Sequence, residues 1–298
     1  MTPTDTPVPC GSCGQTVLEP LFTGRDRNQR MVTRTFSIAR CAACGVVQTI
    51  PPPDDAERAA MYPVQYYPGI IDRNSNKRSQ LDKIALVRAH KASGRLLDVG
   101  AGVGLFVRHA LDNGFEAQGV EMSAQAVETG TRSLDVPLTR GDFLGTELLP
   151  SSFDVVTLWH VFEHLDDPRA ILAKIHRILK PDGVVIIAVP NIHSIQARIF
   201  RGSWYHLDVP RHLFHYSPDS LAHVLSGAGF RIVDTRFGWS EHDPAGFLGS
   251  IMRLSPPDEG LVHRAVRKLI GAPVARVVAR CESSVHMGGT FAIVASAH

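Results

Sequence analysis

The stretch LLDVGAGVG at residues 96–104 decides the fold. Its first four residues predict a short buried strand, and its three alternating glycines let the following turn approach a bound nucleotide closely. A dinucleotide fingerprint would place its third glycine at position 105, where this chain has Leu105. Asp98, two residues before the first glycine, also suits a cation better than a pyrophosphate. The stretch therefore favours S-adenosylmethionine, which carries an ammonium and a sulfonium but no phosphate.

Helix and strand patterns alternate on both sides of this stretch. Apolar residues recur at helical spacing in LDKIALVRAHKA, residues 81–92, and again in residues 168–179. Short strands are predicted at residues 115–121, 153–159 and 184–190, with helices between them. Such alternation is typical of βαβ units and of an α/β fold with a parallel sheet.

Acidic residues follow two further strands. Glu121 ends the second strand, 21 residues after Gly100, where a carboxylate accepts both ribose hydroxyls of a nucleoside. Asp142 and Phe143 follow the third strand, where the acid can accept from an adenine amino group while the ring covers the base. Because parallel strands end at one edge of the sheet, these residues and Asp98 are expected to share one ligand.

The segments LLDVGAGVG, VEMS, GDF and FDVVTLWHVFEHL, taken in order, resemble the motifs of class I S-adenosylmethionine-dependent methyltransferases. The resemblance covers residues 81–191. It implies a Rossmann-like, seven-stranded sheet whose last strand is antiparallel. It also implies that the cofactor is bound by Asp98, Gly100, Ala101, Gly102, Gly104, Glu121, Met122, Asp142, Phe143, Trp159 and His160.

Two Cys-x-x-Cys pairs lie near the start of the chain. Cys10 and Cys13 are separated by 27 residues from Cys41 and Cys44, and a glycine follows each pair. Two such turns can present four thiolates to one Zn²⁺ ion in a closed tetrahedral site. We therefore expect a structural zinc ion in a small β domain at residues 1–50. A linker at residues 51–80 includes Tyr66 and Tyr67, which either cap the substrate pocket or pack the two domains together.

A histidine-rich insertion is predicted at residues 192–219, beyond the fifth strand and over the same pocket. Aromatic and basic side chains together suit a hydroxylated substrate, and a neutral histidine can remove a hydroxyl proton. We expect His206 or His212 to act as the base, with Asp208 as an orienting carboxylate and His160 beside the reacting centre. The expected substrate contacts are His193, Trp204, Tyr205, Arg211 and His215. The alternative is a loop held together by hydrogen bonds among its own histidines.

The insertion extends the resemblance. Four cysteines, a tyrosine-rich linker, the class I core and DVPRHLFHYS at residues 208–217 are similar to the type 23 methyltransferase family. That resemblance implies O-methylation of a sugar, oligosaccharide or glycosylated metabolite within residues 81–298. His160, Glu163 and His164 form an H-x-x-E-H pattern that would place both histidines on one helical face. A catalytic divalent metal there is the less favoured interpretation.

Composition limits the other functions. The 298 residues carry a formal net charge of +2, which argues against binding a polyanion by bulk electrostatics. An RNA methyltransferase that grips RNA through the zinc domain, or a non-catalytic partner-binding domain, remains an alternative. No apolar run reaches membrane-spanning length and no secretory signal is visible, so we expect a cytoplasmic protein. A basic amphipathic segment at residues 261–281 either packs on protein or touches a membrane surface. The sequence leaves monomer and homodimer open.

Overall fold

The computed structural model describes residues 8–61, 77–238, 242–254 and 261–297. Its larger sheet has seven strands in the order β10-β11-β8-β7-β4-β5-β6. The strands are β4 (Gly94–Val99), β5 (Phe115–Glu121), β6 (Leu138–Arg140), β7 (Phe153–Trp159), β8 (Leu179–Pro190), β10 (Phe230–Phe237) and β11 (Thr290–Ala297). The pairs from β6 to β8 are parallel, whereas β11 runs antiparallel to both β8 and β10. The expected Rossmann-like sheet with an antiparallel last strand is confirmed.

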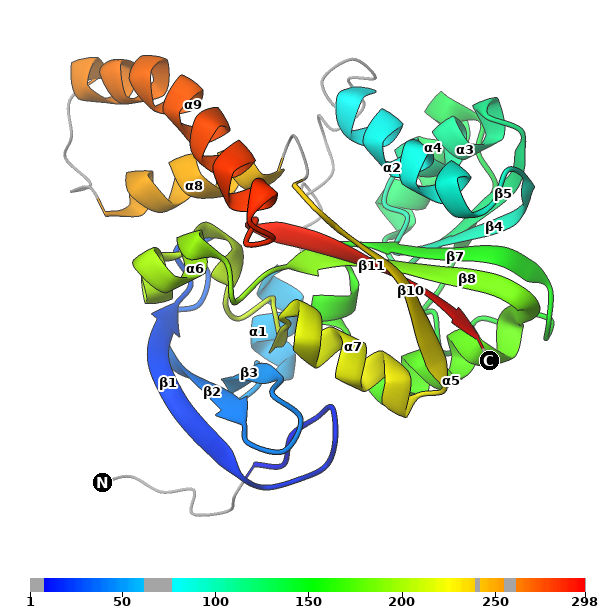
Figure 1. Ribbon diagram of the computed structural model, residues 1–298, viewed down its shortest axis with the longest axis horizontal. Coiled ribbons are helices and arrows are strands. Elements are labelled where there is room, and N and C mark those ends of the chain that lie inside the picture. Colours follow the sequence, from blue (N-terminus) through cyan, green and yellow to red (C-terminus); the bar gives the residue numbers. More distant parts are fainter. Residues whose placement is uncertain (1–7, 62–76, 239–241, 255–260, 298) are drawn as a thin grey trace.

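Helices cover both faces of this sheet, as Figure 1 shows. One face carries α2 (Lys77–His90), α3 (Leu105–Asp112) and α4 (Ala124–Leu134), and the other carries α5 (Pro168–Ile178) and α7 (Pro218–Gly227). The α5 helix begins as predicted, because the Asp167 carboxylate accepts from the amide of Ala170 and proline occupies the first turn. The following KPDG segment does not separate helix from strand, since β8 already begins at Leu179.

A second sheet contains the cysteine pairs. It has the order β1-β2-β3-β9, with β1 (Leu18–Arg25), β2 (Thr35–Cys41), β3 (Val47–Ile50) and β9 (Phe214–His215). The first three strands come from the N-terminal segment, but β9 belongs to the histidine-rich insertion and pairs antiparallel with β3. The short helix α1 (Asp55–Met61) follows β3. The N-terminal sheet is therefore completed by the segment predicted to cover the substrate.

The remaining insertion consists of short helices. These are α6 (Ile195–Phe200), η3 (Arg201–Ser203) and η4 (Tyr205–Leu207), while η2 (Phe162–His164) follows β7. Phe36 and Ile38 of β2 pack with Trp204 and Leu207 in one buried cluster. This apolar cluster packs the insertion against the N-terminal sheet.

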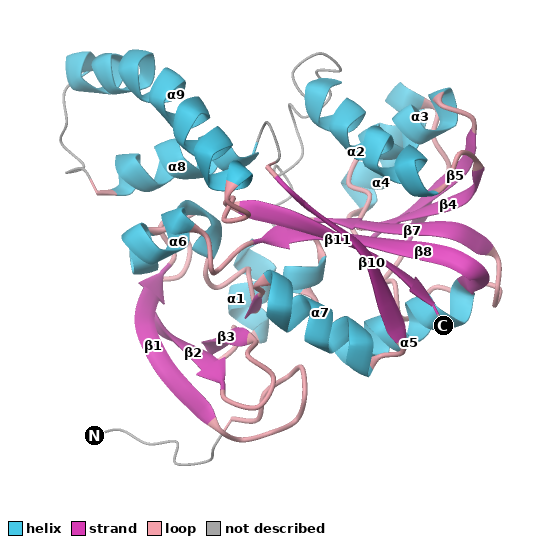
Figure 2. Cartoon of the chain, in the orientation of Figure 1, coloured by secondary structure: helices cyan, strands magenta, loops and turns pink. Residues whose placement is uncertain are grey.

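Between β10 and β11 the described residues form two helices. They are α8 (His242–Arg253), which sequence analysis did not identify, and α9 (Leu261–Ser284), which contains the predicted basic segment. Figure 2 shows both helices beyond the end of the main sheet, near α6. Glycines on α8 permit this packing, since a Cβ at Gly246 would overlap the His206 ring and one at Gly249 would overlap Tyr205. In the part of the chain that the structure describes, no helix is both long enough and apolar enough to span a bilayer.

Candidate active site

The glycine-rich turn lies at the carboxyl edge of β4. Gly100, Gly102 and Gly104 all have positive φ angles, of 69°, 55° and 77°, so the turn uses the conformations that glycine alone adopts readily. A Cβ on Gly100 would lie 2.6 Å from a methyl carbon of Val161. The turn is therefore pressed against the segment that follows β7, and it brings bare backbone to the edge where a ligand can approach.

Two carboxylates shape this edge. Glu121 accepts from the backbone amides of Gly102 at 2.9 Å and Ser123 at 2.8 Å, which fixes the glycine turn to the end of β5. Asp98 is buried and accepts from the Thr157 hydroxyl at 2.7 Å. Burial raises the pKa of Asp98 to about 7, although the nearby Lys83 ammonium opposes that rise. A cation delivered by a ligand would favour the ionised form of this carboxyl.

The other predicted cofactor residues lie along the same edge. Asp142 is exposed and accepts from the amide of Gly145, whereas the Phe143 ring is buried. Met122 is 68% exposed just beyond β5. Trp159, at the end of β7, packs edge-on against Phe106 with the ring centroids 5.2 Å apart. The fold thus brings the predicted cofactor residues to the ends of β4, β5, β6 and β7.

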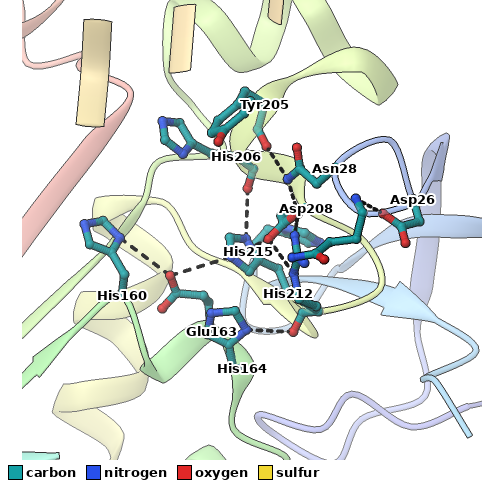
Figure 3. Close-up of polar contacts among 12 residues, drawn as sticks. Asp26, Asn28, His160, Glu163, His164, Tyr205, His206, Asp208, His212 and His215 are labelled. Carbon is teal, nitrogen blue, oxygen red and sulfur yellow. Dashed lines mark hydrogen bonds and ion pairs between the residues drawn. The ribbon is translucent and has the colours of Figure 1, made fainter. Parts of the chain in front are cut away.

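Beyond β7 the chain enters a cluster of histidines, shown in Figure 3. His160 has a φ of 57°, so it does not continue into a helix. The only helical residues here form the single turn η2, and the prediction that His160 and His164 share one helical face is wrong. His160 instead turns its Nδ1 atom to 3.6 Å from the Glu163 carboxylate. It also lies beside His242 of α8, with ring centroids 4.3 Å apart.

His206 and His212 lie in the same cluster and are buried. The Nε2 atom of His206 lies 3.1 Å from the His242 carbonyl oxygen, and the Nδ1 atom of His212 lies 2.9 Å from the His206 carbonyl oxygen. Burial lowers the pKa of His206 to about 4 and lowers that of His212 well below its ordinary value. Burial and the Lys83 charge also lower the pKa of His160. At neutral pH all three imidazoles are therefore uncharged, the form that can accept a proton.

Asp208 connects this cluster to the N-terminal sheet. The Arg211 guanidinium and the Asn28 side-chain amide both donate to its carboxylate. The same carboxylate lies 3.8 Å from Nε2 of His212. Asn28 comes from the turn between β1 and β2, where Asp26 accepts from three backbone amides. The turn between β1 and β2 therefore holds the Asp208 carboxylate, the predicted orienting group, in place.

The predicted substrate contacts do not all lie together. Trp204 is 1% exposed inside the packing cluster with β2, and His215 is buried against the Thr49 hydroxyl at 3.0 Å. Tyr205 is 39% exposed beneath the Arg253 guanidinium, and His193 is exposed at the start of the insertion. The positions of Trp204 and His215 indicate packing rather than direct contact with a ligand. Tyr66 and Tyr67 lie outside the described residues.

Sequence reasoning missed two side chains at this site. His242 reaches it from α8, and the Lys83 ammonium, from α2, lies 5.3 Å from the centre of the Trp159 ring. The proline in the first turn of α8 is a helix-start signal that was available for His242. Nothing in the local pattern indicates where that helix packs.

The four N-terminal cysteines converge as predicted. One sulfur atom from each lies within 4.8 Å of all the others, and the Cys10–Cys44 and Cys13–Cys41 sulfurs are both 3.6 Å apart. Sulfurs around a tetrahedral zinc ion with bonds of 2.3 Å lie about 3.8 Å apart, so the donor set fits that metal. Gly14 and Gly45 follow the pairs with positive φ angles.

Comparison with known proteins agrees with this architecture. A family model described as a methyltransferase domain matches residues 72–235, more than half of the chain. A ubiquinone biosynthesis O-methyltransferase of Neisseria meningitidis is 29% identical over 161 residues. That alignment covers 48% of this chain and 66% of the relative's length.

Solved structures show the same fold at lower identity. A chain from the complex of the Haloferax volcanii Trm112 methyltransferase activator with a methyltransferase aligns with a TM-score of 0.52 and 19% identity. The alignment covers 75% of this chain and 91% of that one. Phosphoethanolamine N-methyltransferase 2 of Haemonchus contortus, solved with S-adenosylmethionine, gives 0.50 and 17%, covering 73% and 52%. The chain belongs to the methyltransferase domain family and has the fold of the class I S-adenosylmethionine-dependent enzymes.

Proposed function

We propose that this protein transfers the methyl group of S-adenosylmethionine to a hydroxyl group of a sugar, an oligosaccharide or a glycosylated metabolite. The observation that carries the proposal is the position of neutral His160. It follows β7 directly, next to Val161, which packs on the glycine turn, and it contacts the Glu163 carboxylate and the His242 ring of the histidine cluster. A proton acceptor therefore lies at the edge of the sheet where the predicted cofactor residues gather, in contact with the buried histidine cluster.

The residues at the carboxyl edge fit the cofactor. Each Glu121 oxygen accepts one backbone amide and keeps a second lone pair for a ribose hydroxyl. Asp98 offers a carboxyl that would ionise beside the methionine ammonium, and Asp142 and Phe143, which follow β6, are the residues proposed to hold the adenine. The bound cofactor supplies an electrophilic methyl group. The chain's own residues orient it and exclude water.

The base accepts the proton of the acceptor hydroxyl as the new bond forms. His160, His206 and His212 are all uncharged because burial lowers their pKa values. His206 donates through Nε2 to a carbonyl oxygen, which leaves Nδ1 as its accepting nitrogen. We assign the base to His160, which directly follows β7 at the cofactor edge, with His206 and His212 ordering the pocket beside it.

The acceptor is proposed to be polar and uncharged. The chain's formal charge of +2 supports such a molecule over a polyanion such as RNA. Since relatives are named ubiquinone biosynthesis O-methyltransferases, a hydroxyl of a ubiquinone precursor is the competing acceptor. We further propose that the four cysteines hold one structural Zn²⁺ ion, because four thiolates leave no open position for substrate.

Methyl transfer from labelled S-adenosylmethionine tests the proposal. The acceptor panel contains sugars, glycosides, phenols and an RNA transcript. We expect label on a sugar hydroxyl, and His160→Ala should lower kcat by about 100-fold or more, the usual contribution of a general base. Cofactor affinity, measured by calorimetry, should fall by much less than kcat, because the other cofactor residues remain in place. Labelling of RNA or phenols alone would overturn the acceptor class, and absence of cofactor binding would overturn the activity.

A further inference from the structure

A buried carboxylate lies at the centre of the histidine cluster. Glu163 is 1% exposed, and neither of its carboxylate oxygens has a hydrogen-bond partner among the residues that the structure describes. Leaving a buried charged group without a donor is costly. The carboxylate therefore needs a counter-charge or a proton in the space that it faces.

In their neutral forms His212 and His164 do not supply a donor to Glu163, and the Nδ1 atom of His160, at 3.6 Å, lies beyond hydrogen-bond distance. A backbone carbonyl oxygen only accepts, so the Nδ1 atom of His212 must carry the hydrogen that it directs to the His206 carbonyl. Its Nε2 atom then presents a lone pair, and this atom lies 3.9 Å from Glu163 and 3.8 Å from Asp208. The Nδ1 atom of His164 similarly donates to the Arg211 carbonyl oxygen at 2.9 Å. Lone pairs that face a carboxylate repel it unless a proton or a metal cation lies between them.

The three side chains converge at metal-binding spacing. One ring nitrogen each from His164 and His212 and one oxygen of Glu163 all lie within 4.8 Å of one another. Ligand atoms at 2.0–2.2 Å from an ion are about 3.0–3.5 Å apart, so side-chain movements of about 1 Å would bring all three atoms to bonding distance of one ion. Metal-bound histidines usually donate their second ring N–H to a carbonyl, as both do here.

We propose that Glu163, His164 and His212 bind one divalent first-row transition ion. Two imidazoles and one carboxylate suit Mn²⁺, Fe²⁺, Co²⁺ or Zn²⁺ and leave coordination positions for other ligands. This site is separate from the four cysteines. The geometry carries it where the sequence did not, because His212 is distant along the chain and the burial of Glu163 is a property of the fold.

The role of the ion rests on the proposed function. An acceptor hydroxyl on an open position would become more acidic. His160, 3.6 Å from the same Glu163 oxygen, would take the hydroxyl proton. The hydroxyl oxygen would then bond to the methyl carbon as the carbon–sulfur bond breaks, releasing S-adenosylhomocysteine.

Binding of Mn²⁺ to the zinc-replete protein, followed by electron paramagnetic resonance, tests the site without cofactor or acceptor. We expect one Mn²⁺ per chain. Glu163→Gln keeps the shape of the side chain but removes its charge, and it should weaken Mn²⁺ binding by at least about 100-fold. Loss of a residue that only hydrogen-bonds to a metal ligand usually weakens binding by about 10- to 100-fold, and loss of the ligand itself should cost more. The control Glu128→Gln removes an exposed carboxylate on α4 and should bind as the parent does.

Failure of this proposal is distinguishable from failure of the proposed function. Absence of Mn²⁺ binding, with no Co²⁺, Fe²⁺ or second Zn²⁺ bound in its place, would mean that Glu163 holds a proton or water. Unchanged Mn²⁺ binding by folded Glu163→Gln would also overturn the site. If Glu163→Gln loses the native circular dichroism spectrum, His212→Gln replaces it, with the exposed His223→Gln as control. Cofactor binding by calorimetry on the same preparation tests the methyltransferase assignment separately.

Discussion

Asp243 shows how a single buried acid can set the pH dependence of stability. It lies in the first turn of α8 and accepts from the Thr290 hydroxyl at 2.5 Å. Its other oxygen has no hydrogen-bond partner within the described ranges. Burial raises the pKa of Asp243 to about 7, with a smaller contribution from the nearby charge of Glu282. The folded state therefore keeps a proton that the unfolded chain releases.

The sign of the effect follows from that proton. Between the unfolded pKa near 4 and the folded pKa of about 7, the folded state binds more protons, so the free energy of unfolding falls as the pH rises. Asp243→Asn should remove this loss, worth roughly 3 kcal/mol between pH 4 and pH 7. Urea unfolding at both pH values measures it. Equal pH dependence in Asp243→Asn and the parent would show that Asp243 is ionised in the folded state.

At the scale of an element, α8 presses two glycines against the insertion. A Cβ on Gly246 would overlap the His206 ring, so Gly246→Ala must displace either the helix or the imidazole. We expect a loss of about 1–3 kcal/mol in stability, the usual cost of overpacking. Methyl transfer should fall as well, because α8 also carries His242 against His160. Thermal unfolding and turnover measure the two effects.

The control is Gly227→Ala at the end of α7. A Cβ at this position meets no atom within 4 Å, so alanine there should leave turnover unchanged and stability equal or slightly higher. If Gly246→Ala were as stable and as active as Gly227→Ala, the contact between α8 and His206 would not matter for the site.

The same elements show what local sequence could predict. The glycine turn and the strands around it carry their structure in short patterns, because alternation and backbone conformation are local properties. The start of the α5 helix could likewise be predicted from Asp167 and the proline that follows it. In contrast, the pairing of β9 with β3 joins segments far apart in the chain, and two residues of strand carry no periodicity. The burial of Glu163 and the approach of His242 depend on that tertiary packing and could not be predicted.

At the scale of the whole molecule, the cysteine sheet and the histidine cluster are continuous. Cys41 ends β2, which pairs with β3, and β3 pairs with β9. The Thr49 hydroxyl on β3 donates to the His212 carbonyl oxygen at 2.8 Å. The cofactor residues, in contrast, follow β4, β5, β6 and β7 of the other sheet. Loss of the cysteine site should therefore disturb the arrangement of the histidine cluster more than that of the cofactor residues.

Cys41→Ser tests this order of effects. Loss of one thiolate should release the zinc ion and loosen β2 and β3, since structural zinc contributes directly to folding. We expect turnover to fall by about tenfold or more, equivalent to ~1.4 kcal/mol, while the dissociation constant for S-adenosylmethionine changes much less.

Zinc content, cofactor affinity by calorimetry and turnover are measured together, with Mn²⁺ present so that the histidine site stays supplied. Replacement of the exposed Cys281 by serine is the matched control and should change none of the three. Equal losses of cofactor affinity and turnover in Cys41→Ser would mean that the cysteine sheet supports the whole fold rather than the histidine cluster in particular.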